Sequence, residues 1–213
     1  MSSKEIILNK IKSSGYKMPN IDVSAPSQNP SSHIISSDDD IYAEFTQRIV
    51  ANKALLVESS PEKLNEDIQK IIDKETVKNL IYPDSLSFDV ANLNIENKFK
   101  FDKPVDGFKA QIFDYDVSII DARGGVSSHG VACIASSKSQ PRLLSLTPKV
   151  CIALIKKDSI VKSLCDMLNK IKKEDGKLPT NVVFISGPSR TSDIELQLVL
   201  GVHGSQIFYA VTY

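Results

Sequence analysis

The sequence has no excess of charge of either sign, because 26 lysines and arginines balance 26 aspartates and glutamates among its 213 residues. Proteins that bind nucleic acid or a membrane surface through charge usually carry a basic excess. General DNA or RNA binding is therefore disfavoured. Long apolar runs are lacking as well, since Val150 to Ile155 is far shorter than the roughly 20 residues that cross a bilayer. We expect no transmembrane segment.

The pattern of a signal peptide and a metal-binding pair of cysteines are also lacking. Charged residues interrupt the apolar ones between Met1 and Gly15, whereas a signal peptide keeps an uninterrupted apolar centre, so we expect a cytoplasmic protein. Cys133, Cys151 and Cys165 form no CxxC pair that could hold zinc or an iron–sulfur cluster. We predict reduced, mostly buried thiols, and we expect this chain to bind no metal or cofactor.

The N-terminal residues predict an appendage to a single domain. Ser3 to Ser13 has apolar residues on one side of a helical pattern and lysines on the other, as in a helix that docks on the body or on a partner. Gly15 to Ser37 is rich in Ser, Pro and Asn and predicts an extended or disordered linker. We therefore divide the chain into residues 1–37, helix and linker, and residues 38–213, one α/β domain.

The start of that domain predicts a capped helix. Asp38, Asp39 and Asp40 precede apolar residues at helical spacing, and a helix N-terminus favours negative charge. We interpret these aspartates as a cap and not as a metal site.

Beyond this helix, strand and helix patterns alternate, which is the signature of an α/β fold. We predict strands at 54–57, 80–82, 117–122, 130–135, 150–155, 181–186 and 207–211, and helices at 59–73, from Asp158 as cap to about 175, and at 191–200. The strands 117–122 and 130–135 could form a hairpin, and 85–101 is too irregular to assign. Right-handed crossovers would give a three-layer sandwich with a mostly parallel sheet between helices.

One predicted strand-to-helix junction, Phe184 to Glu195, carries groups suited to an anion. It lies where open α/β sheets bind ligands. Gly187 permits close backbone approach, and Ser189, Thr191 and the first helix amides could cradle phosphate or carboxylate beside the Arg190 fork.

A structural interpretation of the same residues is equally open. Ser192 and Glu195 fit a capping box, with Arg190 paired locally. The segment is neither a Walker loop nor a GxGxxG fingerprint. His203, between Gly204 and the end of the predicted helix, could act as a general acid or base, although a histidine in such a turn is more often structural.

The loop from Asp121 to Gly130 is a second candidate region, because it gathers an acid, bases, hydroxyls and glycines between two predicted strands. It is either a plain hairpin connection or a second wall of the cleft. The wall would be formed by Arg123, Gly124, Gly125, His129 and Gly130. Ser127, Ser128 and His129 are sequence neighbours, and a nucleophile's base normally comes from elsewhere in the fold, so no catalytic residue is assigned.

Three strings carry a family resemblance: Arg142-Leu-Leu-Ser-Leu-Thr-Pro148, Ser186-Gly-Pro-Ser-Arg-Thr-Ser-Asp-Ile-Glu195 and Leu198-Val-Leu-Gly-Val-His-Gly204. They resemble the LUD-domain family, and more closely its lactate utilization protein C (LutC-like) members. The resemblance covers Asp114 to the C-terminus well and the region from Asp38 more loosely. It implies a fold similar to the NagB, ribose-5-phosphate isomerase and CoA-transferase superfamily, and a role in oxidising L-lactate to pyruvate. It also implies LutA-like and LutB-like iron–sulfur proteins as partners, which would hold the clusters.

The resemblance also implies site residues. The positions that match the family motif are Gly187, Pro188, Ser189, Arg190, Thr191, Asp193, Glu195, Gly201, His203 and Gly204. The chain departs from the family where relatives carry an acidic-Thr-Gly-Thr/Ser run, because Ser128-His129-Gly130-Val131 replaces it.

Three hypotheses follow. The first is a non-redox accessory subunit of an L-lactate-oxidising iron–sulfur complex. The second is a small enzyme or sensor that binds a phosphorylated or CoA-type metabolite at the loop from Gly187 to Thr191. The third is a pure interaction module that uses the N-terminal helix.

Overall fold

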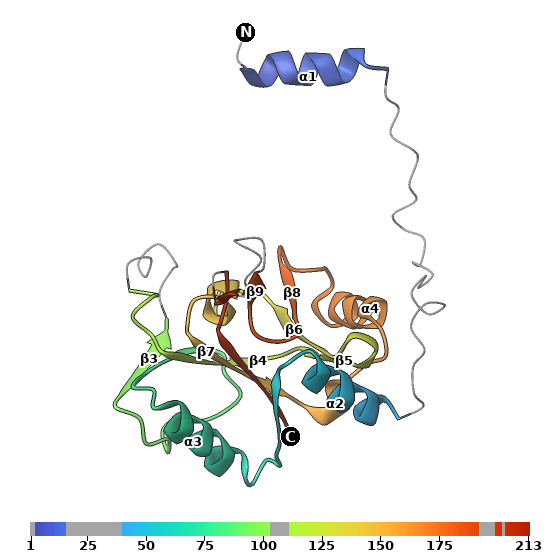
Figure 1. Ribbon diagram of the computed structural model, residues 1–213. Helices are drawn as coiled ribbons and strands as arrows, with labels where there is room; N and C mark the ends of the chain where they lie inside the picture. Colours follow the sequence, from blue (N-terminus) through green and yellow to red (C-terminus); the bar gives the residue numbers. More distant parts are fainter. Residues whose placement is uncertain (1–2, 16–39, 103–110, 192–198, 202) are drawn as a thin grey trace.

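A six-stranded parallel sheet forms the centre of the computed structural model, which describes residues 3–15, 40–102, 111–191, 199–201 and 203–213 (Figure 1). The strand order is β1-β11-β7-β4-β2-β3. The strands are β1 (Leu55–Glu58), β2 (Asn79–Pro83), β3 (Asn97–Phe101), β4 (Val117–Asp121), β7 (Val150–Ile155) and β11 (Ile207–Thr212). β7 lies between β11 and β4, and all six of its residues are buried. Its continuous apolar run is therefore explained by cover on both faces.

Helix α3 (Leu64–Glu75) covers one face of this sheet, below it in Figure 1. Its buried residues recur at helical spacing and are Leu64, Ile68, Ile71 and Ile72. They pack in one cluster with alternate strand residues such as Ile119, Ile152 and Val211. The predicted helix at 59–73 is thus confirmed, although it begins later, at Leu64.

The other face is covered by α2 (Ile41–Ala51) and by a small antiparallel sheet of β5 (Gly124–Val126), β6 (Val131–Ala135) and β8 (Val182–Ile185) in the order β5-β6-β8. Helix α4 (Leu164–Asp175) packs on the small sheet through Met167 and Ile171. Figure 1 shows β6, β8 and α4 above the large sheet, opposite α3, and α2 to the lower right of them. The α/β class with helices on both sides is confirmed.

The predicted hairpin of 117–122 with 130–135 is wrong. β4 lies in the large sheet between β7 and β2, whereas β6 pairs with β5 and β8. The segment predicted as a loop is itself strand β5, because its glycines allow close packing. A Cβ on Gly125 would lie 2.6 Å from a ring carbon of Phe45.

The expected parallel arrangement of the last three strands is also wrong in part. β7 and β11 are parallel neighbours, but β8 pairs antiparallel with β6 in the small sheet. The N-cap of α4 also differs from the predicted one. Asp158 lies in a 3-10 turn, η5 (Lys157–Ser159), and α4 is capped by Ser163, whose capping box with Asp166 is complete.

The predicted helix at 191–200 is not formed at either described end. Arg190–Thr191 (β9) pairs antiparallel with Val199–Leu200 (β10), and residues 192–198 lie outside the described part of the chain. Gly201 then takes a positive φ of 81°. A two-stranded ribbon therefore follows the candidate loop, where sequence spacing indicated a helix.

The predicted helix at Ser3–Ser13 and the predicted cap at Asp40 are confirmed. α1 spans Ser3–Ser13 and buries none of its residues. Asp40 caps α2 by accepting hydrogen bonds from the amides of Tyr42 and Ala43, each at 3.0 Å. Asp38, Asp39 and the predicted linker lie outside the described residues. None of the described helices combines the length and apolarity that a membrane span requires.

Candidate functional site

The loop after β8 lies against the turn that leads into β11. The Ser189 amide donates to the Ser205 carbonyl at 2.9 Å, and the Gly201 amide donates to the Ser189 carbonyl at 3.0 Å. Gly204 fits beneath Ser189, since a Cβ on Gly204 would lie 3.2 Å from the Ser189 Cβ. The structure thus brings Gly187–Arg190 and His203–Gly204, two of the predicted groups, to one place.

Between these two segments lies a pocket of about 320 Å³. Its lining residues are Ser145, Leu146, Val183, Phe184, Ile185, Ser186, Gly187, Pro188, Ser189, Arg190, His203, Gly204, Ser205 and Phe208. Ser145 and Leu146 precede β7, and Ser205 precedes β11. The pocket therefore lies at the amino-terminal ends of these parallel strands.

This position corrects the expectation of a ligand site at the carboxyl edge of the parallel sheet. That expectation assumed that the strand before the loop belongs to the parallel sheet. Because β8 instead runs in the small antiparallel sheet, its end delivers the loop to the opposite edge. The Gln206 amide, which donates to the Lys149 carbonyl at 2.9 Å, marks that edge just before β11 and β7 begin to pair.

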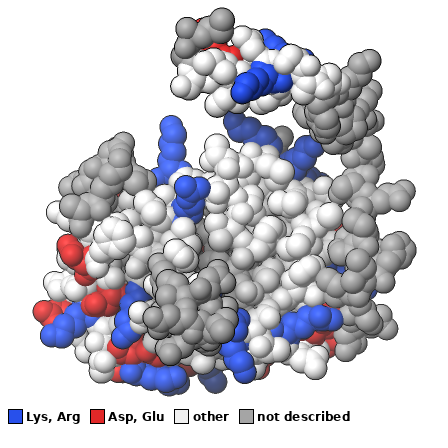
Figure 2. All heavy atoms as spheres, turned by 45° about the horizontal axis from the view of Figure 1, so that its top comes forward, with Lys and Arg blue, Asp and Glu red and all other residues white. Residues whose placement is uncertain are grey.

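The pocket lining combines apolar side chains with basic and hydroxyl groups. Phe184, Phe208 and Leu146 supply apolar surface, while Arg190 and His203 supply basic side chains. Among the described lining residues there is no aspartate or glutamate. Figure 2, in which the top of Figure 1 comes forward, shows a mostly white central surface with several Lys and Arg side chains on and around it, and acidic side chains mainly toward the lower left, where basic ones lie among them.

The serines of the pocket fall into two kinds. Ser205 Oγ donates to the Pro148 carbonyl at 2.8 Å, and Ser145 Oγ donates to the Arg142 carbonyl at 2.8 Å, so both hold the backbone. The hydroxyls of Ser186 and Ser189 make no hydrogen bond within the part of the chain that the structure describes. Within that part, neither hydroxyl holds the backbone as those of Ser205 and Ser145 do.

The backbone at Gly187 makes a close approach, as the sequence predicts, but it approaches the end of α2 and not a ligand. A Cβ on Gly187 would lie 2.4 Å from the Asn52 carbonyl oxygen. Only glycine fits there without displacing α2.

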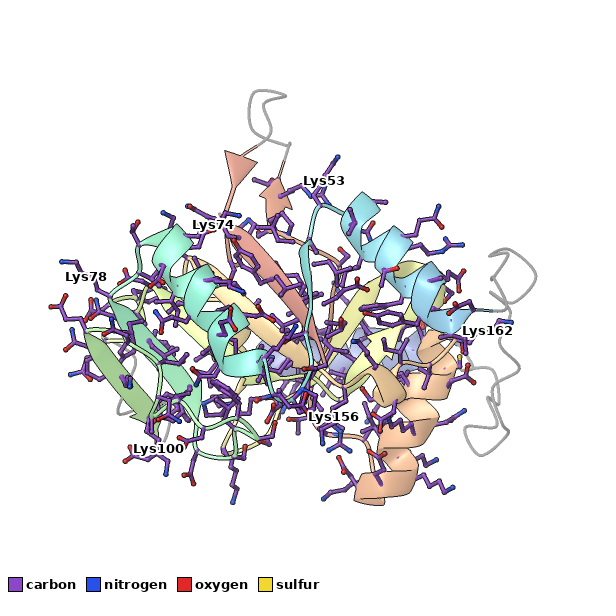
Figure 3. The ribbon with its side chains drawn as sticks, turned by 90° about the horizontal axis from the view of Figure 1, so that it is seen from below. Lys53, Lys74, Lys78, Lys100, Lys156 and Lys162 are labelled. Atoms are coloured by element: carbon purple, nitrogen blue, oxygen red, sulfur yellow. The ribbon has the colours of Figure 1, made fainter. Side chains whose placement is uncertain are left out.

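Arg190 reaches the same carbonyl. Its Nη2 donates to Asn52 O at 2.8 Å, and the side chain is otherwise exposed. The end of a helix carries partial negative charge, which favours this contact. An arginine has five N–H donors, so the hydrogen bond to Asn52 leaves most of the guanidinium for an anion. In Figure 3, Lys53 marks the end of α2 near the β9–β10 ribbon.

None of the five residues proposed as a second wall lines this pocket. Arg123 binds Glu174 and Asp175 at 2.6 and 2.8 Å. Gly124 and Gly125 are buried in β5.

The last two residues of the proposed wall belong to a turn beside α2. His129 Nδ1 lies 2.8 Å from Ser128 Oγ, and a Cβ on Gly130 would lie 2.4 Å from the Arg48 backbone. Asn52 connects this turn to the pocket, because its Nδ2 donates to the carbonyls of His129 and Gly130 at 2.8 and 3.1 Å.

The remaining predicted positions do not gather at the pocket. Thr191 begins the ribbon and is not among the lining residues. Asp193 and Glu195 lie outside the described residues. Sequence reasoning missed Asn52 and Phe208. The one local signal at Asn52 is an amide residue at the end of a helix.

The cysteines contribute no reactive group to the pocket. Cys133 and Cys151 are buried, and burial raises the pKa of each thiol to about 12. Cys165 is half-buried at the start of α4. The prediction of mostly buried thiols is confirmed.

Comparison with known proteins gives consistent matches. The family model described as LUD domain matches residues 42–212. Lactate utilization protein C of Shouchella clausii (strain KSM-K16) is 36% identical over 98 residues, which are 45% of this chain and 42% of that protein. Lactate utilization protein C of Macrococcus caseolyticus (strain JCSC5402) is 27% identical over 155 residues, 70% of this chain and 67% of that protein.

A solved structure shares the fold. The crystal structure of a DUF162 family protein from Deinococcus radiodurans superposes with a TM-score of 0.62 at 17% identity, and covers 83% of this chain and 98% of that chain. The match to the Shouchella protein spans less than half of that relative's length.

Proposed function

Because this chain belongs to the LUD-domain family, we propose that it acts in the utilization of L-lactate and that its pocket binds a small anion. The two relatives named lactate utilization protein C support the first part of the proposal. The chemistry of the pocket supports the second.

The observation that carries the anion proposal is the lining itself. Arg190, His203 and the hydroxyls of Ser186 and Ser189 meet in one pocket, and its described lining contains no carboxylate. Charge-assisted hydrogen bonds from arginine to a carboxylate or phosphate are among the strong ones. At about 320 Å³ the pocket is at the small end of the range of ligand sites, which runs from about 300 to 1,000 Å³. A short organic acid, such as L-lactate or pyruvate, suits this size better than a CoA-type metabolite.

We further propose a cytoplasmic, non-redox accessory subunit that works with LutA-like and LutB-like iron–sulfur proteins in oxidising L-lactate to pyruvate. The donor chemistry of this chain supports clusters in the partners only. Iron–sulfur clusters are held mainly by groups of cysteine thiolates. Cys133 and Cys151 are buried, and the described residues contain no group of three or more His, Cys, Asp or Glu side chains that could hold a metal.

Calorimetric titration of the purified chain with L-lactate, pyruvate and inorganic phosphate tests anion binding. We expect saturable binding of an organic acid, weakened about 10- to 100-fold by Arg190→Ala, since hydrogen bonds to charged groups contribute about 1.5 to 3 kcal/mol. Arg123→Ala is the matched control, because it removes the same charge from an ion pair outside the pocket. Binding of phosphate alone would favour the phosphorylated-metabolite alternative, and binding of no anion would refute this part of the proposal.

Anaerobic purification of the tagged chain from its host tests the subunit proposal. We expect two iron–sulfur proteins to co-purify, with a visible cluster spectrum and L-lactate-dependent dye reduction. A colourless, isolated protein without activity would contradict it.

A further inference from the structure

Asn52 is the residue at which three separate parts of the chain meet. It ends α2, where its amide donates to the Arg48 carbonyl at 3.0 Å. Its carbonyl oxygen faces the Gly187–Arg190 loop, and its side-chain amide faces the turn at His129 and Gly130. Its backbone N–H, its carbonyl oxygen and its side-chain Nδ2 thus each contact a different segment.

On the pocket side, Asn52 O holds Arg190. The Nη2–O distance of 2.8 Å is that of a full hydrogen bond, and Gly187 packs against the same oxygen. Arg190 is an exposed side chain, and ordering a long flexible side chain on binding costs free energy. A fixed acceptor that orders the guanidinium before the ligand arrives removes part of this cost.

On the opposite side, the Asn52 amide is itself held. Its Nδ2 donates to two carbonyls, of His129 and Gly130, which uses both N–H groups. In the turn, Gly130 takes a positive φ of 59° and packs directly on the α2 backbone at Arg48. The end of α2 therefore cannot rotate away from the loop without breaking these contacts.

We infer that Asn52 is a positioning residue, which fixes the Arg190 guanidinium for anion binding and ties the pocket to the Ser127–Gly130 turn. This inference rests on the proposed anion site. The turn that lies outside the pocket thereby influences ligand affinity through one side chain.

A double-mutant cycle on the full chain tests the inference, with L-lactate, pyruvate and phosphate as titrants. Asn52→Ala keeps the backbone carbonyl that accepts from Arg190 but removes the side-chain amide that ties this carbonyl to the turn. It should therefore weaken anion binding about three- to tenfold, as Arg190 loses part of its preorganisation. In the double variant Asn52→Ala/Arg190→Ala, the affinity should equal that of Arg190→Ala alone, because Asn52 acts through Arg190. Losses that multiply in the double variant would overturn the inference and indicate a general structural role.

The control is Gln69→Ala, which removes a comparable amide network. Gln69 Nε2 donates to Asp73 and to the Asn94 carbonyl at 2.7 and 3.0 Å, on α3 and away from the pocket. It should leave anion affinity unchanged. Asn52→Ser, which retains one donor, provides a milder variant and should give a smaller loss than Asn52→Ala.

NMR relaxation of the Arg190 side chain separates failure of the inference from failure of the proposed function. Asn52→Ala should lower the order parameter of the Arg190 Nε–H group, and Gln69→Ala should not. Unchanged Arg190 order would overturn the inference, with or without an anion bound. Lowered order in a chain that binds none of the three anions would support the positioning role and refute the anion site.

Discussion

Individual residues at the pocket divide into those that hold the backbone and those that face the cavity. Ser145, Ser205 and Gly187 hold segments in place, whereas Arg190 and His203 present basic groups. The sequence predicted Arg190 and His203 from their residue types. It could not predict Asn52, because its role depends on carbonyls at 129 and 130 that only the tertiary fold brings to it.

Gly187→Ala tests the close packing of the Gly187 backbone against the Asn52 carbonyl. The added Cβ would lie 2.4 Å from Asn52 O, so we expect a loss of about 1 to 3 kcal/mol in the free energy of unfolding and weaker anion binding. The control is Gly176→Ala, where φ is 73° and a Cβ meets no atom within 4 Å. It should cost about 1 kcal/mol through backbone strain alone and leave anion affinity unchanged. Thermal unfolding and calorimetry measure both effects, and equal affinities for the two variants would contradict the packing account.

The buried thiols predict a dependence of stability on alkaline pH. Burial raises the pKa of Cys133 and Cys151 from 9.0 to about 12, so the folded chain retains protons that the unfolded chain releases. Their contribution to stability is therefore complete below about pH 9 and declines as the pH rises toward 12. Urea midpoints at pH 7 and pH 10 should differ less in Cys133→Ala/Cys151→Ala than in the wild type. An identical pH dependence in both proteins would contradict a contribution of the buried thiols.

At the scale of elements, strands covered on both faces were predicted well and pairing partners were not. The apolar run of β7 indicates a buried strand whichever strands it pairs with, so the local sequence pattern was enough to predict it. The partners of β6 and β8 depend on contacts distant in sequence, and the residue types at Gly124 and Gly125 indicated a loop. The segment 191–200 was predicted as a helix because Ser192 and Glu195 fit a capping box, whereas its two described ends pair as β9 and β10.

The start of α4 gives an element-scale prediction. Ser163 accepts the Asp166 amide hydrogen bond at 3.1 Å, whereas Asp158 lies in the preceding turn η5. Ser163→Ala should lower the free energy of unfolding by about 1 kcal/mol, and Asp158→Ala should change it by less than about 0.5 kcal/mol. Urea denaturation of the two variants decides between the caps, and the reverse order of effects would contradict the assignment.

For the whole molecule, the family resemblance found in the sequence is confirmed, and the α/β architecture places the pocket away from the edge that the fold class suggested. The general rule for open parallel sheets failed because the strand before the loop belongs to a second sheet. The motif residues thus identified which loop carries the candidate site. The position of that loop relative to the parallel sheet followed only from the strand topology.

The N-terminal segment gives a prediction at the same scale. α1 buries none of its residues, and its side chains Ile6, Ile7, Leu8 and Ile11 are 44 to 58% exposed. Removal of residues 1–37 should therefore shift the free energy of unfolding by less than about 0.5 kcal/mol. A large loss in thermal unfolding would show that α1 packs on the body in solution.

The most direct test of the central claim is residue-resolved NMR titration of the chain with L-lactate and pyruvate. We predict saturable shifts of the backbone amides in Ser186–Arg190, except Pro188, and in His203–Ser205, lost in Arg190→Ala and retained in Arg123→Ala. Shifts confined to other parts of the molecule, or no saturable shift with either acid, would contradict the assignment of this pocket as an organic-acid site.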